Sequence, residues 1–482
     1  METVRRKYGK DFPHRAYSRI TIFMKTILVN IGSPFFIRNF LRTEAMDMVK
    51  RQGNTRMVFL VPQEKLAYYK DQFRDEFFLF DVLPEVHGTY SERIFKFLES
   101  QSIHTRTVAM LQRTRLWRHG STAGFSPRLG RFCLAILCWQ MGRFRWWRQA
   151  IRKLYMIVPN HAFDGILDRY TPDVVFCPNM IYAADCALLK AARKRKIITI
   201  GMLLSWDNFY SKTFLRVQPD WLMVHTDIIR EHAVRFGDYP SEQVYVVGIP
   251  QYDRSFRRQG IIPRDEFIRG LGGDPAKKLI VYAFSGKNGL HLDFDMVEIL
   301  YEATLRGEIT EPVNVLIRPY PKFDLPSATL EDMHTRYGFL GKRAMAHVGK
   351  KGEYDWEFDE TSLDLQTNTL AHADVIITMY STFFIEGAIF DKPLIAVAFD
   401  AKQKRDYWNS AKRFFEWNHL HDIKPLNGIW IAESRKEFIR AINEYLQSPA
   451  HDQEGRRRIV SQQCQFTDGN SARRVASFLL NI

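Results

Sequence analysis

The chain has 482 residues, of which 46% are hydrophobic, so it is long enough for two domains that each bury their own core. Its five cysteines show no metal-binding spacing, and their odd number is typical of reduced thiols in a cytosolic protein. The longest uninterrupted apolar run, 132–139, is too short to span a membrane, and residues 1–23 lack the apolar stretch of a signal peptide. We therefore expect a cytoplasmic protein, soluble or peripheral on the inner face of the cell membrane, with residues 1–23 as an N-terminal extension.

Strand and helix patterns alternate along the chain, which is typical of parallel, doubly wound sheets. The first half predicts helices at 35–50 and 183–193 and strands at 24–33, 57–62, 77–83, 173–179, 220–226 and 243–253. The segment 197–212 predicts a strand that runs into a polar turn. The second half predicts strands at 278–289, 313–321, 375–378 and 394–399, and closing helices at 433–447, 452–465 and 468–480. We expect an α/β protein with two Rossmann-like domains facing a cleft. The predicted boundaries are an N-terminal acceptor-side domain at 24–253, a linker at 254–277, a C-terminal nucleotide-donor-binding domain at 278–466 and a C-terminal helix at 467–482.

The formal net charge of +15 is concentrated in one region of the first domain. Residues 101–163 contain no Asp or Glu, and eleven Arg or Lys between Arg106 and Lys153 leave a formal charge of only +4 for the other residues. We interpret 101–163 as a basic helical insert. Within it, 143–155 predicts a helix with two opposite faces. Trp146, Trp147, Ala150, Ile151 and Leu154 form the apolar face, and Arg145, Arg148 and Arg152 form the basic face.

Two interpretations of this helix are close in weight. Its tryptophans could enter the headgroup region of an anionic membrane while its arginines bind the phosphates, or it could pack on the core with a solvated basic face. We favour the membrane surface, contacted by Arg145, Trp146, Trp147, Arg148 and Arg152. Nucleic acid is a weaker alternative, because the apolar residues lie on one helical face and are not interleaved with the arginines for base stacking.

Polar residues gather where predicted strands end, and ligands of such sheets bind outside the carboxyl ends of the strands. The stretch 372–400 predicts a strand, a tight turn, a short helix and a strand. A helix N-terminus after a strand can hold phosphate, and Glu386, one turn further on, can accept hydrogen bonds from ribose hydroxyls. An ordinary capped helix explains the same local pattern about as well. Together with the turns 285–287 and 318–320, this stretch predicts a site for a nucleotide. The nucleotide would be part of the donor substrate, and we expect no cofactor.

The same turns suggest a mechanism for transfer from a nucleoside diphosphate. Lys287 and Arg318 could stabilise the charge of the departing diphosphate, and Asp207 could be the base, although a turn-capping role weighs equally. The donor would contact Ser285, Gly286, Tyr320, Tyr380, Ser381, Thr382 and Glu386. The acceptor side would include Ser33, Trp206, Asn208 and Lys212. We expect no metal, because the only DFD motif, 293–295, falls at a helix start where it would act as a cap; the chain also has no P-loop motif.

Three segments carry a resemblance to a known family. DVIITMYSTFFIEGAIFDKPLIAVAFD, the tail FTDGNSARRVASFL, and LLSWDNFYSK with the later VVGIPQYD resemble glycosyltransferases of the GT-B superfamily. They are most similar to the branch of CDP-glycerol glycerophosphotransferases and related surface-polysaccharide transferases. The resemblance covers most of 170–480. It implies transfer from a nucleotide-activated donor to a glycan or lipid-linked acceptor, with an anionic membrane surface as a further partner.

Two motifs differ from that branch. Relatives usually have His-Pro where this chain has Arg318-Pro319-Tyr320-Pro321, and Pro-Thr-x-Arg where it has 284–287. A tyrosine is not a cation near neutral pH, so we favour a nucleoside diphosphate sugar over CDP-glycerol as the donor. CDP-glycerol transfer, a non-hydrolysing sugar-nucleotide epimerase and a non-catalytic binding protein remain alternatives.

Overall fold

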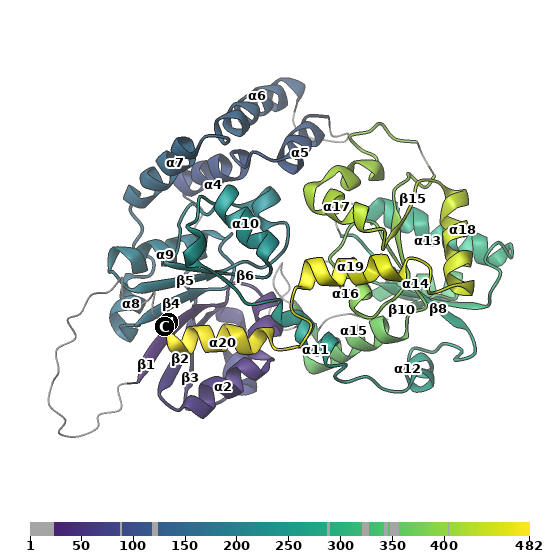
Figure 1. The fold of residues 1–482 in the computed structure, drawn as a ribbon, viewed down its shortest axis with the longest axis horizontal. Coiled ribbons are helices and arrows are strands. Elements are labelled where there is room, and N and C mark those ends of the chain that lie inside the picture. The colour runs from purple at the N-terminus through teal and green to yellow at the C-terminus, as the bar shows by residue number, and fades with distance from the viewer. Residues whose placement is uncertain are drawn as a thin grey trace.

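The computed structural model describes residues 24–86, 89–117, 124–286, 290–320, 327–341, 346–347, 356–402 and 404–482. Figure 1 shows two α/β domains side by side, each with a sheet covered by helices. Every strand pair within the two large sheets is parallel. Their strands are apolar along nearly their whole length, because helices bury both faces of a parallel sheet.

The N-terminal sheet has seven strands in the order β3-β2-β1-β4-β5-β6-β7. The strands are β1 (Lys25–Asn30), β2 (Thr55–Val61), β3 (Phe78–Val82), β4 (Val174–Cys177), β5 (Ile198–Met202), β6 (Trp221–Val224) and β7 (Val244–Val246). Its covering elements include the π-helical turns η1 (Ile37–Leu41) and η3 (Asn208–Lys212) and the helices α2 (Glu44–Gln52), α3 (Leu66–Gln72), α8 (Asp164–Tyr170), α9 (Ala183–Lys194) and α10 (Asp227–Arg235). The strand order reverses between β1 and β4, which creates a crevice at their carboxyl ends.

The C-terminal sheet has six strands in the order β10-β9-β8-β13-β14-β15. These are β8 (Lys278–Ala283), β9 (Val313–Arg318), β10 (Leu340–Gly341), β13 (Val375–Thr378), β14 (Leu394–Val397) and β15 (Trp430–Ala432). The helices around it are α13 (Leu290–Leu305), α14 (Ser327–Tyr337), α15 (Glu360–His372), α16 (Phe383–Ile389), α17 (Asn418–Ile423), α18 (Arg435–Gln447) and α19 (Gln453–Cys464). A short antiparallel pair joins β11 (Ala346–His347) to β12 (Trp356–Glu357).

The last helix, α20 (Ser471–Asn481), crosses back from the C-terminal domain to the N-terminal one. It packs against α2, and its apolar residues belong to the N-terminal core (Figure 1). Asp253 holds its first turn, since its two carboxylate oxygens accept the backbone N–H groups of Ser471 at 2.9 Å and Ala472 at 2.7 Å. The chain therefore connects the two domains twice, where it enters the C-terminal domain and where α20 returns to the N-terminal domain.

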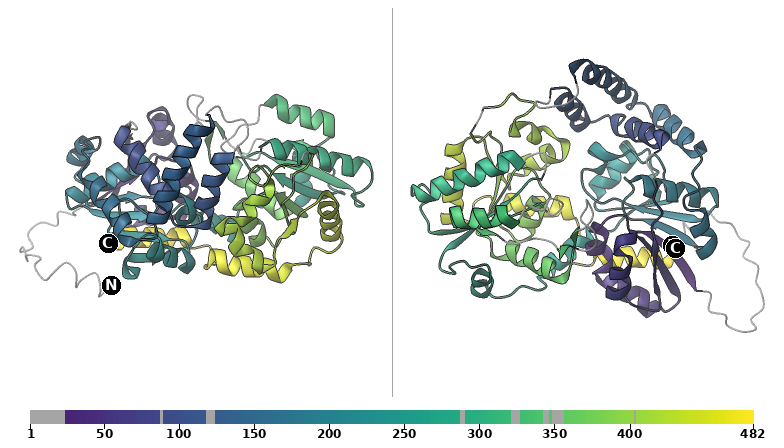
Figure 2. Two further views of the ribbon diagram at one scale, coloured as in Figure 1. Left: turned by 90° about the horizontal axis from the view of Figure 1, so that it is seen from above. Right: turned by 180° about the vertical axis from the view of Figure 1, so that it is seen from behind.

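Four helices cover the outer side of the N-terminal domain and extend toward the C-terminal one. They are α4 (Tyr90–Gln101), α5 (Arg106–Trp117), α6 (Phe125–Met141) and α7 (Arg145–Ile157). The right view of Figure 2 again shows these blue helices at the edge of the molecule, and the left view shows them on the side that faces the viewer. Among the described residues, no helix is both long and apolar enough to cross a membrane.

The predicted orientation of α7 is wrong for two of its arginines. Arg148 and Arg152 are buried, and both form ion pairs with the carboxylate of Asp238, Arg152 at 2.7 Å. Arg152 also donates to the backbone carbonyls of Leu215 and Phe214. An amphipathic pattern alone predicts that only apolar groups face the domain. Here the carboxylate and the carbonyls offer acceptors inside the domain, so the two arginines point inward. Arg145 and Trp146 remain exposed, and Trp147 is half-buried.

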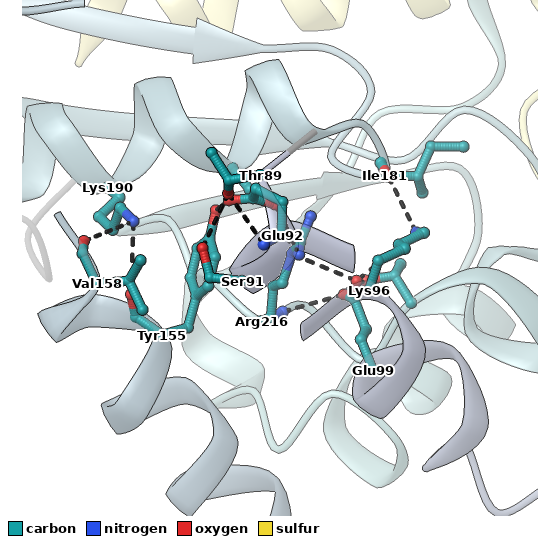
Figure 3. A network of polar contacts seen from close by, with 12 residues as sticks. Thr89, Ser91, Glu92, Lys96, Glu99, Tyr155, Val158, Ile181, Lys190 and Arg216 are labelled. Carbon is teal, nitrogen blue, oxygen red and sulfur yellow. Dashed lines mark hydrogen bonds and ion pairs between the residues drawn. The ribbon is translucent and has the colours of Figure 1, made fainter. Parts of the chain in front are cut away.

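A second buried polar network fastens α4 and α7 to the same domain (Figure 3). Arg216, 1% exposed, lies between two carboxylates of α4, 3.1 Å from Glu92 and 3.5 Å from Glu99. The hydroxyl of Tyr155, from α7, donates to Glu92 as well. Lys96 of α4 donates to the backbone carbonyl of Ile181 at 3.0 Å, next to the end of β4. These helices are therefore held by charge pairs as well as by apolar packing.

The predicted strands and closing helices are confirmed, with shorter bounds. The predicted helix at 35–50 is two elements, η1 and α2, because the side chain of Thr43 accepts the backbone N–H of Ala45 and starts α2 afresh. The strand within 197–212 ends at Met202. The region 254–277 includes two short helices, α11 (Asp253–Phe256) and α12 (Arg264–Gly270).

Candidate functional site

A cleft with a volume of about 390 Å³ lies between the domains, at the carboxyl ends of strands from both sheets. The predicted site residues that line it are Trp206, Asp207, Lys212, Ser285, Arg318, Tyr320, Tyr380, Ser381, Thr382 and Glu386. Asn208 is buried and does not line this cleft, and Ser33 lines a separate, smaller cavity. Lys287 lies outside the described residues.

Glu386 lies deep on the C-terminal side of the cleft, close enough to two arginines to interact with both charges. These are Arg318, at the end of β9, and Arg38, from η1 of the other domain. Burial raises the pKa of Glu386, and the two guanidinium groups lower it. Gln366 donates to Glu386 and accepts from Arg318 at 3.4 Å. The arrangement combines one acceptor carboxylate with two cations, which suits a ligand that carries both hydroxyl groups and negative charge.

Both arginines are also held by aromatic rings. Arg318 lies over Phe383, 4.5 Å from the ring centroid, and Arg38 lies over Phe358 at 4.6 Å. Arg38 donates to Gln251 as well. Burial lowers the pKa of both guanidinium groups, and Glu386 opposes that shift. Arginine stays charged under such conditions, so the cleft presents fixed positive charge from both domains.

The turn after β8 is shaped by a buried carboxyl group. Asp293 accepts the backbone N–H of Ser285 at 3.0 Å and its hydroxyl at 2.8 Å, and burial raises the pKa of Asp293 to about 7. Gly286 has φ +93°, and a Cβ there would lie 3.4 Å from the ring of Tyr320. A glycine therefore lets Tyr320 pack directly on the turn. Asp293 orders this turn, which corrects the prediction that it caps its own helix.

The stretch 372–400 folds as predicted, with one difference at the start of its helix. Thr382 is the N-cap residue of α16 but makes no side-chain capping bond; instead, the hydroxyl of Ser381 accepts the backbone N–H of Phe383 at 3.1 Å. Tyr380 stacks on Phe414 with ring centroids 3.9 Å apart. The hydroxyl-rich turn therefore faces the cleft beside an aromatic wall.

On the N-terminal side, Asp207 and Lys212 form an ion pair at 2.8 Å. Burial alone would raise the pKa of Asp207, but Lys212 and His419 lower it to about 2. His419 comes from α17 of the opposite domain, and burial lowers its pKa to about 4. Asp207 is therefore a stable carboxylate at neutral pH, and a weak proton acceptor.

Sequence reasoning missed the cleft residues Arg38, Gln366, Trp417 and His419, all of which line the cleft. His419 contacts Trp206 edge to face and Trp417 in a tilted arrangement, which gives an aromatic surface. Arg38 comes from the N-terminal domain and joins the site only when the two domains meet, whereas Gln366, Trp417 and His419 belong to the C-terminal domain and follow no strand-end or capping pattern.

A strap at 356–358 from the C-terminal domain contacts the N-terminal domain, with Phe358 under the cleft residue Arg38. Glu357, 0% exposed, forms an ion pair with Lys65 at 3.3 Å and accepts from the hydroxyl of Tyr69. Phe358 accepts from Arg42 at 2.7 Å through its carbonyl. Asp422 of α17 also accepts from Tyr210 of the N-terminal domain. Polar contacts thus join the domains at two separate places.

A match to a family model shows which protein family the chain belongs to. Residues 217–481, more than half of the chain, match the model described as CDP-Glycerol:Poly(glycerophosphate) glycerophosphotransferase. The chain belongs to this glycerophosphotransferase family. The matched region includes all of the C-terminal sheet and the crossing helix α20. No curated protein matches the chain.

Solved structures give the fold of this glycerophosphotransferase family member. The UDP-GlcNAc 2-epimerase from Neisseria meningitidis, solved with UDP-GlcNAc bound, is 11% identical with a TM-score of 0.50, and the match covers 95% of this chain and 100% of that one. A structure described as a UDP-N-acetylglucosamine 2-epimerase from Listeria monocytogenes is 11% identical with a TM-score of 0.52, covering 95% and 96%. Two facing Rossmann-like domains with a crossing C-terminal helix make this a GT-B fold, and the family makes the chain a transferase.

Proposed function

We propose that this transferase binds a nucleoside diphosphate sugar in the interdomain cleft and moves the sugar to a hydroxyl of a surface-glycan or lipid-linked acceptor. The observation that carries this proposal is the pairing of Arg38 and Arg318 around Glu386. Glu386 would accept hydrogen bonds from ribose hydroxyls, and the arginines would bind the diphosphate. The aromatic wall of Tyr380 and Trp417 offers a surface on which a base could stack.

The chemistry follows from where charge grows. When the bond from the sugar carbon to the diphosphate oxygen breaks, the diphosphate gains negative charge, and preorganised cations stabilise that charge most in the transition state. Two half-buried arginines from opposite domains can provide this stabilisation without a metal. Among the described residues, no cluster of three or more His, Cys, Asp or Glu side chains could hold an ion. We propose that activity survives EDTA; strict dependence on magnesium or manganese would contradict this account.

Asp207 has a different part in this proposal from the one expected of it. A carboxylate with a pKa of about 2 takes up a proton poorly, so we propose that it fixes Lys212 and His419 at the acceptor side of the cleft. The base for the acceptor hydroxyl would then be another group.

CDP-glycerol is the second candidate donor, and the family match favours it. The acceptor oxygen would bond to the phosphorus that carries glycerol as the bond from that phosphorus to CMP breaks, so that negative charge grows on the departing CMP near the same arginines. Tyr320 favours the sugar, because burial raises its pKa further and the phenol cannot supply the positive charge of a protonated histidine.

The test is a thermal-shift screen of nucleotide sugars and CDP-glycerol, followed by product analysis with and without acceptor. A sugar nucleotide that raises the melting temperature of the wild type but not of an Arg38→Met variant supports the donor site. Conversion of a UDP-sugar without acceptor would identify an epimerase instead. Stabilisation by CDP-glycerol alone would replace the sugar proposal with glycerophosphate transfer.

We also propose that an anionic membrane surface binds the helices α6 and α7. The outward face of α6 exposes Leu129, Leu134 and Leu137, the last 58% exposed, and α7 exposes Trp146 and Leu154. Arg131, Arg143, Arg145 and Lys153 are exposed among them. Each cation near an anionic leaflet contributes about 1 kcal/mol, and salt weakens the attraction.

This part is tested by sedimentation with vesicles of phosphatidylcholine and phosphatidylglycerol. Leu134→Asp with Leu137→Asp should release the protein, whereas Leu305→Asp, at a 71% exposed leucine of α13, should not. Unchanged vesicle binding in the double variant would reject the α6 surface. A shift with single-stranded oligonucleotides but not with vesicles would favour nucleic acid.

A further inference from the structure

A second cavity lies inside the N-terminal domain, at the carboxyl ends of β1, β4 and β5. It has a volume of about 10 Å³, which fits one water-sized group. Its polar lining includes Asn30, Asn179, Asp185 and Ser33. The cavity lies where the strand order reverses between β1 and β4, the point at which open α/β sheets bind ligands.

The polar groups around this cavity are incompletely paired. Asn179 is 5% exposed, and neither atom of its side-chain amide has a hydrogen-bond partner in the part of the chain that the structure describes. Asn30, 2% exposed, donates to Asp185 at 2.6 Å, but its side-chain carbonyl has no partner within the described ranges. Buried amides are normally paired, and leaving three such atoms unpaired costs stability. A ligand that pairs some of them would offset part of that cost.

The cavity adjoins the interdomain cleft. Tyr182 and Leu204, both only partly buried, line the cleft and the cavity alike. Lys96 holds the neighbouring Ile181 through its carbonyl (Figure 3), which fixes the loop that follows Asn179. A group that enters from the cleft therefore reaches Asn179 past one layer of side chains.

We propose that Asn30, Asn179 and Asp185 form a subsite for a single alcohol hydroxyl, which inserts from the cleft. The hydroxyl would accept from the amide nitrogen of Asn179 and donate its single hydrogen to one of the two unpaired carbonyl oxygens, so that two of the three unpaired atoms gain a partner. Naming this alcohol as part of the acceptor rests on the proposed function; the subsite itself does not.

The direct test uses glycerol as the probe and the methyl group of Met202, which also lines the cavity, as the reporter. The methyl resonance of Met202 should shift saturably as glycerol is added to the full chain labelled at its methionine methyl groups. Asn179→Leu should abolish the shift. Because Leu removes a buried unpaired amide, the melting temperature of this variant should not fall, and Asn179→Ala provides a smaller side chain if Leu does not fit.

Two results would overturn the subsite. One is a Met202 resonance that glycerol leaves unmoved in the wild type. The other is a shift that persists in both Asn179 variants, which would place glycerol elsewhere and leave the cavity to a structural water. Both results are independent of any nucleotide, so they are distinguishable from failure of the donor site.

A kinetic arm applies once a donor and an acceptor are known. Asn179→Leu should raise the KM for the acceptor about tenfold and leave the dissociation constant of the donor unchanged. Val29→Ala is the matched control, because Val29 is buried in β1 beside Asn30 but lies in the core and not at the cavity. It should lower the melting temperature without changing the acceptor KM. Equal acceptor KM values for wild type and Asn179→Leu would contradict the assignment.

Discussion

Replacing Arg318 by methionine tests the central part of the proposed mechanism. In the free protein this guanidinium makes one long hydrogen bond, 3.4 Å to Gln366, and lies 4.5 Å from the ring centroid of Phe383. Losing such a ring contact costs about 0.5–2 kcal/mol, and methionine retains part of the packing. The folded state should therefore survive the change.

The effect on catalysis should be larger. Two unit charges 4 Å apart interact by about 4 kcal/mol at an effective dielectric of about 20, and removing one preorganised donor typically lowers kcat by about 10² to 10³. We expect a fall in kcat of that size with a smaller change in donor affinity, because the charge that Arg318 meets grows at the transition state. Single-turnover kinetics and calorimetric titration of the donor separate the two quantities.

The matched control is Arg336→Met, which removes an exposed arginine that lies over Tyr337 in the same domain, away from the cleft. Its kcat should equal that of the wild type. Arg318→Lys should recover part of the lost rate, since it restores charge without the planar fork. A folded Arg318→Met variant with unchanged kcat and unchanged donor affinity would refute the placement of the diphosphate.

Three further predictions concern Glu386 and Asp207 in the cleft and the ion pair of Lys65 with Glu357 outside it. Glu386→Gln should weaken donor binding by about 1–3 kcal/mol in calorimetric titration if its oxygens accept ribose hydroxyls, and equal affinities would exclude that role. The pKa of Asp207 is about 2 in the folded chain against 3.8 ordinarily, so its ion pair contributes stability that is present above pH 3.8 and lost as the pH falls toward 2. Urea unfolding should show Asp207→Asn about 2 kcal/mol less stable than wild type at pH 7 and no less stable near pH 2; a constant difference would contradict this. Lys65→Met should destabilise by about 3–5 kcal/mol because it leaves the buried Glu357 without a cation, and adding Glu357→Leu should recover most of that loss in thermal unfolding.

The fold was largely predictable because parallel strands are buried on both faces and therefore read as short apolar runs. Each predicted strand, such as 57–62 or 375–378, has such a run at its centre, and the structure places a strand there. The short strands β10 and β11 escaped prediction because two residues carry no pattern. The helix α6 escaped because its exposed face is also apolar, so its sequence lacks the polar stripe that marks an amphipathic surface helix.

The orientation of α7 shows a second limit of pattern reading. Hydrophobic periodicity assumes that charged groups face water, yet Arg148 and Arg152 face inward to a single carboxylate on a distant loop. Asp238 is 86 residues from Arg152 in sequence, so no window that includes the helix also includes its partner. The apolar face that the pattern did identify is split, with Ile151 buried and Trp146 exposed.

The candidate site divides in the same way. Residues that follow strand ends, such as Arg318 and Glu386, could be placed from sequence, because parallel strands bring their carboxyl ends to one edge. Arg38 could not, because it lies in a π-helical turn of the first domain and reaches Glu386 only when the strap at 356–358 and the crossing helix α20 hold the domains together. The positive charge of the cleft thus depends on the two domains being held together. Contacts that join the domains outside the cleft, such as Lys65 with Glu357, therefore contribute to the affinity of the cleft for an anionic donor.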